Sequence, residues 1–145
     1  MRYFDTSILT PLIREEKSSS RVTQFVGGLP KGELAISHWT EVEFASLLAR
    51  HVRMGAIQGE EARETDALFN TIVRRSFVVL SLTAEDCDLA RRYLHKYETR
   101  LRAGDALHLG IAGNRGADAI YTLDKAMIEA GRILGLPVSS GIEME

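Results

Sequence analysis

The period of the hydrophobic positions changes several times along the chain, and these changes predict strands that alternate with helices. Short apolar or β-branched runs typical of strands lie at Met1–Phe4, Glu33–Ser37, Phe77–Leu82, Ala119–Thr122 and Leu136–Val138. The third run is apolar almost throughout, which is typical of a strand that is buried on both faces.

The segments between these runs carry apolar residues at the spacing of three to four that indicates helices. The predicted helices are Ile8–Glu16, Ser18–Val26, His38–Met54, Glu60–Arg75, Thr83–Leu94, Ala103–Asn114 and Ala126–Leu134. Apolar faces are expected at Trp39, Val42, Leu47 and Leu48 in the third helix and at Ala67, Leu68 and Ile72 in the fourth. The connections are too long for hairpins, so we expect a mostly parallel sheet of four to five strands in a three-layer α/β/α sandwich.

Length and composition fit one domain over residues 1–145, with a tail that we expect to be loose from about residue 139. The 145 residues are 45% hydrophobic and 26% charged, and no run reaches the roughly 18 apolar residues of a membrane helix. Cys87 is the single cysteine, is expected to be buried and cannot form an internal disulfide. With no secretory signal at the start, we expect a cytoplasmic protein. The net charge of −2 means that nucleic acid would need a local basic patch or a bound cation.

Four acidic residues stand where predicted strands end or helices begin. Asp5 and Asp124 follow strands, Glu43 lies early in a long helix, and Asp105 lies in the first turn of another helix. In a parallel α/β layer, the ends of strands and the starts of the following helices share one edge of the sheet. The sequence therefore predicts that the four carboxylates converge.

Each acid also has a simpler explanation. Asp5 can cap a helix, Glu43 stands at the capping-box spacing from Thr40, Asp105 complements a helix dipole, and Asp124 can belong to a surface turn. Four carboxylates gathered without a cation would repel one another, whereas Mg²⁺ prefers oxygen ligands of this kind. Their convergence at one edge therefore favours a cation site suited to phosphodiester hydrolysis.

Four segments resemble the motifs of PIN-domain ribonucleases, and most closely those of VapC-type toxins from toxin–antitoxin pairs. They are FDTS at Phe4–Ser7, ISHWTEVEF at Ile36–Phe44, RAGDALHLGIA at Arg102–Ala112 and IYTLDKAM at Ile120–Met127. Each motif is short, but the set occurs in the order and spacing of the family and spans almost the whole chain.

The resemblance implies a PIN-like fold and a metal-dependent endoribonuclease. The acids that would surround Mg²⁺ or Mn²⁺ and carry catalysis are Asp5, Glu43, Asp105 and Asp124. The residues that would support them by hydrogen bonds are Thr6, Ser7 and Thr122. Glu41 competes with Glu43 for the second position, although the family spacing favours Glu43.

The resemblance also implies partners. An RNA substrate, a cognate antitoxin and a homodimer are expected, with the antitoxin crossing the site and packing on the segments Ile8–Leu29 and His38–Met54. The alternative is a catalytically silent domain of the same fold that binds RNA or a protein.

Basic residues that lead up to Asp105, at the start of the third motif, can form a phosphate-binding rim or a merely solvated surface. They are Arg91, Arg92, Lys96, Arg100 and Arg102, with Arg50 and Arg53 or Arg74 and Arg75 as equivalent choices. His108 stands three residues after Asp105, which permits a helper role, although a surface or hydrogen-bonded structural histidine is the simpler interpretation.

Two other enzyme classes place an acid after the first strand, and the sequence disfavours both. Haloacid-dehalogenase-like phosphatases need a second acid two residues later, where this chain has Ser7. Receiver domains need an aspartate after the third strand, and the first one here is Asp86, inside a predicted helix.

Overall fold

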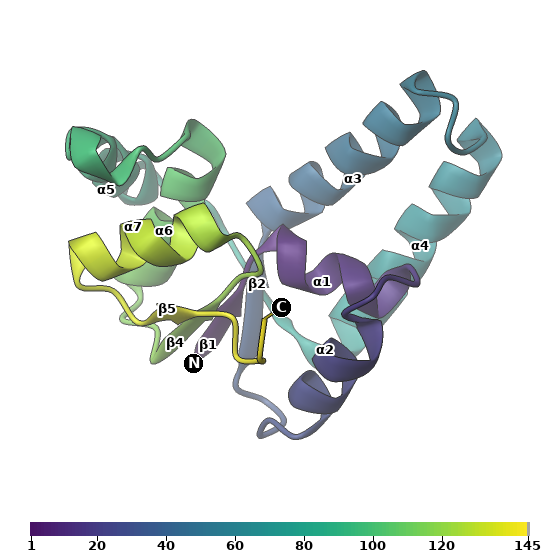
Figure 1. The fold of residues 1–145 in the computed structure, drawn as a ribbon, viewed down its shortest axis with the longest axis horizontal. Helices are drawn as coiled ribbons and strands as arrows, with labels where there is room; N and C mark the ends of the chain where they lie inside the picture. Colours follow the sequence, from purple (N-terminus) through teal and green to yellow (C-terminus); the bar gives the residue numbers. More distant parts are fainter. Residues whose placement is uncertain (145) are drawn as a thin grey trace.

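The computed structural model describes residues 1–144, which form a five-stranded parallel sheet with helices on both faces (Figure 1). The strands are β1 (Arg2–Phe4), β2 (Leu34–Ser37), β3 (Val78–Leu80), β4 (Ala119–Tyr121) and β5 (Val138–Ser139). Their order across the sheet is β3-β2-β1-β4-β5, so β1 lies in the middle and pairs with both β2 and β4. The predicted parallel α/β/α sandwich is confirmed.

Seven α-helices and one short 3₁₀-helix connect the described strands. They are α1 (Thr6–Ile13), α2 (Ser19–Gly27), α3 (His38–Arg53), α4 (Gly59–Ser76), α5 (Ala84–Leu94), η1 (Tyr97–Thr99), α6 (Ala103–Asn114) and α7 (Lys125–Leu134). Figure 1 shows α1 to α4 on one side of the sheet and α5 to α7 on the other. In the same view α3 and α4 run side by side, and the rings of Phe44 and Phe69 stack between them at 4.2 Å.

Two hydrophobic cores follow from the alternation of side chains along the strands. In β1, Tyr3 packs with α6 and α7, whereas Phe4 packs with α1 to α4. In β4, Ile120 and Tyr121 divide between the same two cores. Successive side chains of a strand point to opposite faces, so a strand that is apolar at consecutive positions is covered on both sides.

Capping residues set where the helices next to the sheet begin and end. Ser37 ends β2 and forms a reciprocal capping box with Thr40 at the start of α3. Thr83 and Asp86 form the same arrangement at the start of α5. Gly135 ends α7 in the left-handed conformation (φ 72°), which a residue without Cβ adopts without strain. The predicted helix boundaries therefore agree with the structure to within a few residues.

The third predicted strand differs from expectation. It lies at one edge of the sheet rather than inside it, and it is shortened to Val78–Leu80. Val78 and Leu82 are both exposed. An apolar run alone does not distinguish a central strand from an edge strand.

The apolar faces of α3 and α4 were predicted only in part: Leu48 is buried as expected, but other expected positions are not. The buried residues are Thr40, Phe44 and Leu48 in α3 and Ala62, Phe69 and Val73 in α4. Val42 and Leu68, which we expected in the core, are exposed. The aromatic pair between the two helices sets the inner face.

Three local predictions need correction. The helix predicted at Ile8–Glu16 begins earlier, directly after Asp5, and ends at Ile13, so Pro11 lies in its second turn. Cys87 is exposed rather than buried. The described part of the tail is not loose: Ile142 packs on a core, and the Arg21 guanidinium donates to the Glu143 carbonyl (2.5 Å). The last position of the predicted tail, residue 145, lies outside the described residues.

Within residues 1–144, no helix combines the length and apolar character needed to cross a membrane.

Candidate active site

The central strand brings the first of the predicted acids to the middle of one sheet edge. Asp5 follows β1 directly, and its backbone N–H donates to the Tyr121 carbonyl of β4 (3.1 Å). Chain order reverses on the two sides of β1, because β2 lies on one side and β4 on the other. Parallel sheets bind ligands at such a reversal, at the carboxyl ends of the strands.

The Asp5 carboxylate is buried and held by three donors. Its Oδ1 accepts from the Ser7 hydroxyl (2.7 Å) and from the Ile8 backbone N–H (3.3 Å), and its Oδ2 accepts from the Thr122 hydroxyl (2.6 Å). Burial raises the pKa of Asp5, while the charge of His108 and these hydrogen bonds oppose the rise. Asp5 therefore caps α1, as the simpler interpretation expected, and it also faces the cavity described below.

Glu43 reaches the same edge from the second turn of α3. Its Oε1 accepts from the Thr6 hydroxyl (2.7 Å) and from His108 Nε2. Burial alone would raise the pKa of Glu43, but the hydrogen bond and charge of His108, together with Thr6, outweigh it and hold the pKa below the ordinary value of 4.5. The capping box of α3 pairs Ser37 with Thr40, so Glu43 has no part in capping.

His108 belongs to a buried chain of hydrogen bonds behind Glu43. Its Nδ1 is 2.7 Å from the Tyr3 hydroxyl, which lies 2.8 Å from the Ser37 hydroxyl. A carboxylate only accepts, so His108 Nε2 carries the proton in its bond to Glu43. The i+3 spacing indicated that His108 shares a face with Asp105, but the partner is instead Glu43, which lies 65 positions away in the sequence.

A glycine makes room for the Glu43 carboxylate. A Cβ on Gly104 would lie 2.9 Å from Glu43 Oε2, closer than a carbon atom normally approaches an oxygen. The indole N–H of Trp39 donates to the Gly104 carbonyl (3.2 Å), which fixes α3 against the start of α6. Sequence reasoning did not single out Gly104 or Tyr3, because their roles depend on contacts between distant segments.

Asp105 sits in the first turn of α6 and is half-buried. Its carboxylate accepts no hydrogen bond from any residue of the described chain. Burial, followed by repulsion from Asp124, Asp5 and Glu43, raises the pKa of Asp105 from 3.8 to about 6, against a smaller opposing effect of His108. The repulsion among the four carboxylates is therefore felt most strongly at Asp105, where no hydrogen bond within residues 1–144 offsets it.

Asp124 caps α7 and borders the same space. Its Oδ1 accepts from the Ala126 N–H (2.8 Å) and from the Met127 N–H (3.4 Å). Its own N–H donates to the Thr122 hydroxyl (3.0 Å), the group that donates to Asp5. The three residues predicted to support the acids, Thr6, Ser7 and Thr122, all lie within hydrogen-bonding distance of a carboxylate.

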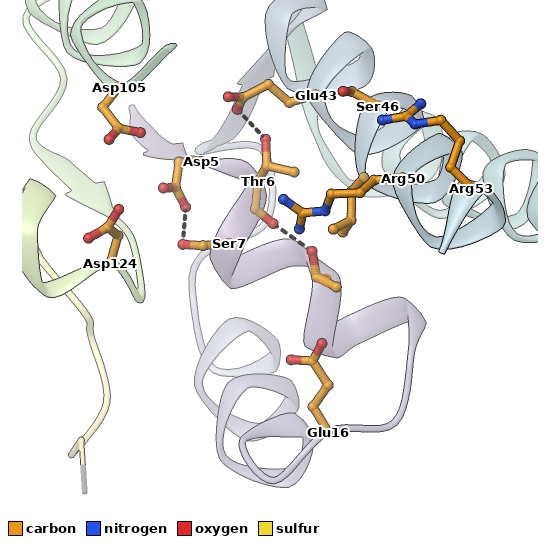
Figure 2. Close-up of a pocket in the computed structure, with 12 residues that line it drawn as sticks. Asp5, Thr6, Ser7, Glu16, Glu43, Ser46, Arg50, Arg53, Asp105 and Asp124 are labelled. Carbon is orange, nitrogen blue, oxygen red and sulfur yellow. Dashed lines mark hydrogen bonds between the residues drawn. The ribbon is translucent and has the colours of Figure 1, made fainter. Parts of the chain in front are cut away.

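The four carboxylates line one cavity of about 500 Å³. Figure 2 shows them around a common space, with Arg50 and Arg53 reaching from α3. Of the predicted basic rim, Arg100 and Arg102 line an adjoining cavity, whereas Arg91, Arg92 and Lys96 line neither. Glu41 also lies outside both cavities and instead pairs with His38 (2.6 Å).

A model of the PIN domain matches residues 2–133. The chain belongs to the PIN-domain family. No curated protein sequence matches it.

Solved structures of similar fold include toxins and toxin–antitoxin complexes. VapC20 of Mycobacterium tuberculosis, described as a sarcin-ricin loop cleaving toxin, is 17% identical, with a TM-score of 0.72 over 90% of this chain and 95% of that one. VapBC-1 of nontypeable Haemophilus influenzae is 20% identical, with a TM-score of 0.65 over 97% and 98%. FitAcB of Neisseria gonorrhoeae is 14% identical, with a TM-score of 0.71 over 97% and 98%. At these identities the likeness establishes the fold alone.

The carboxylates of this PIN domain suit a hard divalent cation in their chemistry. Within residues 1–144, no three Asp, Glu, His or Cys side chains are close enough together to coordinate one ion directly as they stand. Asp5, Glu43 and Asp124 are instead turned toward protein donors. Mg²⁺ keeps several of its waters in protein sites, so direct contact with every acid is not needed. The raised pKa of Asp105 marks the charge that a cation would relieve.

Proposed function

We propose that this PIN domain is a divalent-cation-dependent endoribonuclease and the toxin of a toxin–antitoxin pair. The observation that carries the proposal is the group of four carboxylates that line one cavity at the centre of the sheet edge. Membership in the PIN family and the likeness to VapC20 support ribonuclease chemistry.

The proposed cation ligands are Asp5, Glu43, Asp105 and Asp124, and the cation is Mg²⁺ or Mn²⁺. Bound there, such an ion supplies Lewis-acid polarisation of a phosphoryl oxygen and lowers the pKa of a coordinated water. Thr6 and His108 hold Glu43 ionised and oriented, because both donate to the same carboxylate oxygen. Ser7, Thr122 and the Ile8 N–H do the same for Asp5. In the proposed hydrolysis the oxygen of water bonds to phosphorus, the P–O bond to one ribose breaks, and the leaving ribose oxygen ends with a proton from that water.

The hydroxyls at the site favour water over a protein nucleophile. Ser7 Oγ accepts the N–H of Leu123 (2.9 Å) and donates to Asp5 (2.7 Å), so its proton is already committed. Thr6 Oγ1 donates to Glu43 (2.7 Å). Cys87 lies on α5, outside the cavity. An activated nucleophile needs an adjacent base that takes its proton, and these hydroxyls instead orient carboxylates.

The RNA-binding residues that we propose first are Arg100 and Arg102, because both line a cavity that also contains Glu43, Asp105 and Asp124. Arginine binds phosphate by paired hydrogen bonds that carry no sequence information. We therefore propose no particular RNA sequence as the target.

An antitoxin partner follows from the proposed role, because a nuclease that cuts the RNA of its own cell needs a restraint. Several similar structures are toxin–antitoxin complexes, which supports such a partner. We propose that the antitoxin packs on Ile8–Leu29 and His38–Met54, that the toxin forms a homodimer, and that both act in the cytoplasm. Light scattering of the purified toxin, alone and with the product of a neighbouring small gene, tests the first two statements.

Cleavage of total RNA by the purified protein tests the proposed activity. We expect discrete fragments in Mg²⁺ or Mn²⁺ and none in EDTA. Glu43→Gln removes a cavity carboxylate and should abolish cleavage, whereas Glu41→Gln makes the same change two positions away and should leave it intact. Equal cleavage by Glu43→Gln and wild type would contradict the proposed site. Intact RNA in every lane would instead favour the alternative, a silent binding domain.

A further inference from the structure

The carboxylates stand where two cavities meet, and not at the end of one. The first cavity measures about 500 Å³ and the second about 570 Å³. Glu43, Asp105 and Asp124 line both. The acids are therefore open on two sides, along a path that runs from α3 to the loop before α6.

The far wall of the first cavity is one face of α3. Glu43, Ser46, Arg50 and Arg53 follow one another at helical spacing and all line this cavity. The seven residue-to-residue steps from Glu43 to Arg50 rise about 10.5 Å along the helix. Figure 2 shows the Arg50 side chain extending from α3 over Thr6, on the side of the cavity away from Asp105 and Asp124. Glu16, which would repel a phosphate, lies on the α1–α2 side, so an anion would be drawn to the α3 wall.

The second cavity carries a matching pair of arginines, Arg100 and Arg102. Arg100 is the single non-glycine residue of positive φ in the described chain (φ 56°). Its N–H donates to the Tyr97 carbonyl (3.1 Å), and the Thr99 hydroxyl accepts from the Leu101 N–H (3.3 Å). This left-handed residue ends η1, as residues that terminate helices often do, and the chain then enters α6 through Leu101 and Arg102.

In the described chain, none of these four guanidinium groups has a protein partner. Within residues 1–144, no hydrogen bond or ion pair engages the side chains of Arg50, Arg53, Arg100 or Arg102. By contrast, Arg115 pairs with buried Asp86 at 2.9 Å. Free arginines on both sides of an acidic centre present donors to an external anion rather than stabilising the fold.

We propose that Arg50 and Arg53 form a second phosphate-binding site, so that an RNA strand crosses the carboxylates from one cavity to the other. This inference rests on the proposed ribonuclease function and adds the path of the substrate. Phosphates on one side of the reacting bond contact Arg50 and Arg53, and those on the other side contact Arg100 and Arg102. With a net charge of −2 and four acids at the centre, attraction from both sides offsets the local repulsion of the strand.

RNA binding without cleavage tests the proposal. The probe is end-labelled total RNA cut to 20–40 nucleotides, measured by filter binding in EDTA over a series of salt concentrations. The double variant Arg50→Gln/Arg53→Gln is compared with Arg74→Gln/Arg75→Gln, which removes the same charge from the exposed end of α4 and touches neither cavity. Melting temperatures confirm that both variants are folded.

We expect the first variant to bind at least about tenfold more weakly, equivalent to about 1.4 kcal/mol, because two charged donors to phosphate are removed. Losing two phosphate contacts to a single strand should make the plot of log K against log salt shallower by about 1.4. The control should change neither quantity appreciably.

Other results overturn the proposal in distinguishable ways. If Arg50→Gln/Arg53→Gln and Arg74→Gln/Arg75→Gln weakened RNA binding equally, the effect would depend only on the overall charge of the protein, which would contradict the proposed site. Unchanged binding by Arg50→Gln/Arg53→Gln, with weakening by Arg100→Gln/Arg102→Gln, would confine RNA to one side and leave the α3 arginines to a protein partner. Wild type that neither binds nor cleaves RNA would contradict the proposed function itself.

Discussion

Glu43 and Asp105 are both half-buried carboxylates beside the same cavities, yet their pKa values move in opposite directions. The pKa of Glu43 is lowered, because His108 and Thr6 donate to it and outweigh burial. The pKa of Asp105 is raised to about 6, because burial and three neighbouring acids act on a group that accepts no hydrogen bond within residues 1–144. Burial thus acts on both carboxylates, and their neighbouring residues decide whether the pKa is raised or lowered.

The difference assigns distinct roles to the two acids before any cation binds. Glu43, a proposed cation ligand, is an ionised carboxylate at neutral pH that Thr6 and His108 hold in place. Asp105 is the group whose ionisation the protein leaves uncompensated, so a bound cation would stabilise it most. Acids whose environments push their pKa values apart are typical of sites that bind or transform charged ligands.

The largest expected effect is on the rate of RNA cleavage, and it should be the same for both acids. Asp105→Asn and Glu43→Gln should each lower the rate of RNA cleavage by at least about 100-fold, the size seen when a preorganised charge-stabilising group is removed. Initial rates on labelled RNA in Mn²⁺ measure this. Asp88→Asn on exposed α5 is the control and should cleave like wild type. A variant of either cavity acid that retained full activity would remove that acid from the site.

The support behind Glu43 gives the next largest effect. His108→Ala should weaken Mn²⁺ binding about 10- to 100-fold, because residues that orient a metal ligand contribute that much to affinity. His108→Gln keeps a donor toward Glu43 and should recover part of the loss, and Tyr3→Phe should lose less than His108→Ala. Calorimetric titration measures the affinities. Wild-type affinity in His108→Ala would show that Glu43 needs no such support.

Gly104 tests the space around Glu43 from the other side. Gly104→Ala places a Cβ 2.9 Å from Glu43 Oε2, so the carboxylate or the start of α6 must shift. We expect Mn²⁺ affinity to fall several-fold, and the usual gain of about 0.5–1 kcal/mol for Gly→Ala within a helix to be absent. Gly27→Ala, with nothing within 4 Å of the added carbon, is the control for both readouts. Unchanged affinity in Gly104→Ala would mean that Glu43 is free to move.

The smallest effect is a pair of opposite pH dependences in the cation-free protein. The folded pKa of Asp105 (about 6) exceeds 3.8, so its ionisation lowers stability as pH rises between these values. Asp105→Asn should therefore raise the melting temperature by a few degrees at pH 7.5 and not at pH 4. The pKa of Glu43 is lowered, so its contribution is present above pH 4.5 and is lost as pH falls below it. Glu43→Gln should accordingly lower the melting temperature at pH 7.5, and shifts of the same sign in both variants would contradict the comparison.

The sequence predicted the acidic edge well for a physical reason. Parallel strands place their carboxyl ends at one edge, so Asp5, Asp124 and the start of α3 had to come together once the strands were recognised. Asp105 follows no strand and was placed at this edge because it lies in the first turn of a helix. Helix caps depend on neighbouring residues, but spacing alone did not identify the right pair in α3: the capping box joins Ser37 and Thr40, and not Thr40 and Glu43.

Contacts between distant segments were not readable in this way. The bond from His108 to Glu43 spans 65 positions, and the fit of Gly104 against Glu43 spans 61, so no local pattern marks either one. Val42 and Leu68 obey helical spacing but are exposed, because the stacking of Phe44 on Phe69 selects the buried face. The position of β3 at the edge depends on strand order, which spacing does not determine.

The central claim is that a divalent cation relieves the repulsion concentrated at Asp105. Calorimetric titration of Mn²⁺ into wild type and Asp105→Asn at pH 7.5 tests it most directly. We predict saturable binding by wild type in the millimolar range or tighter, and binding by the variant that is at least about tenfold weaker. Equal affinities in the two proteins, or no saturable binding by wild type, would contradict the account.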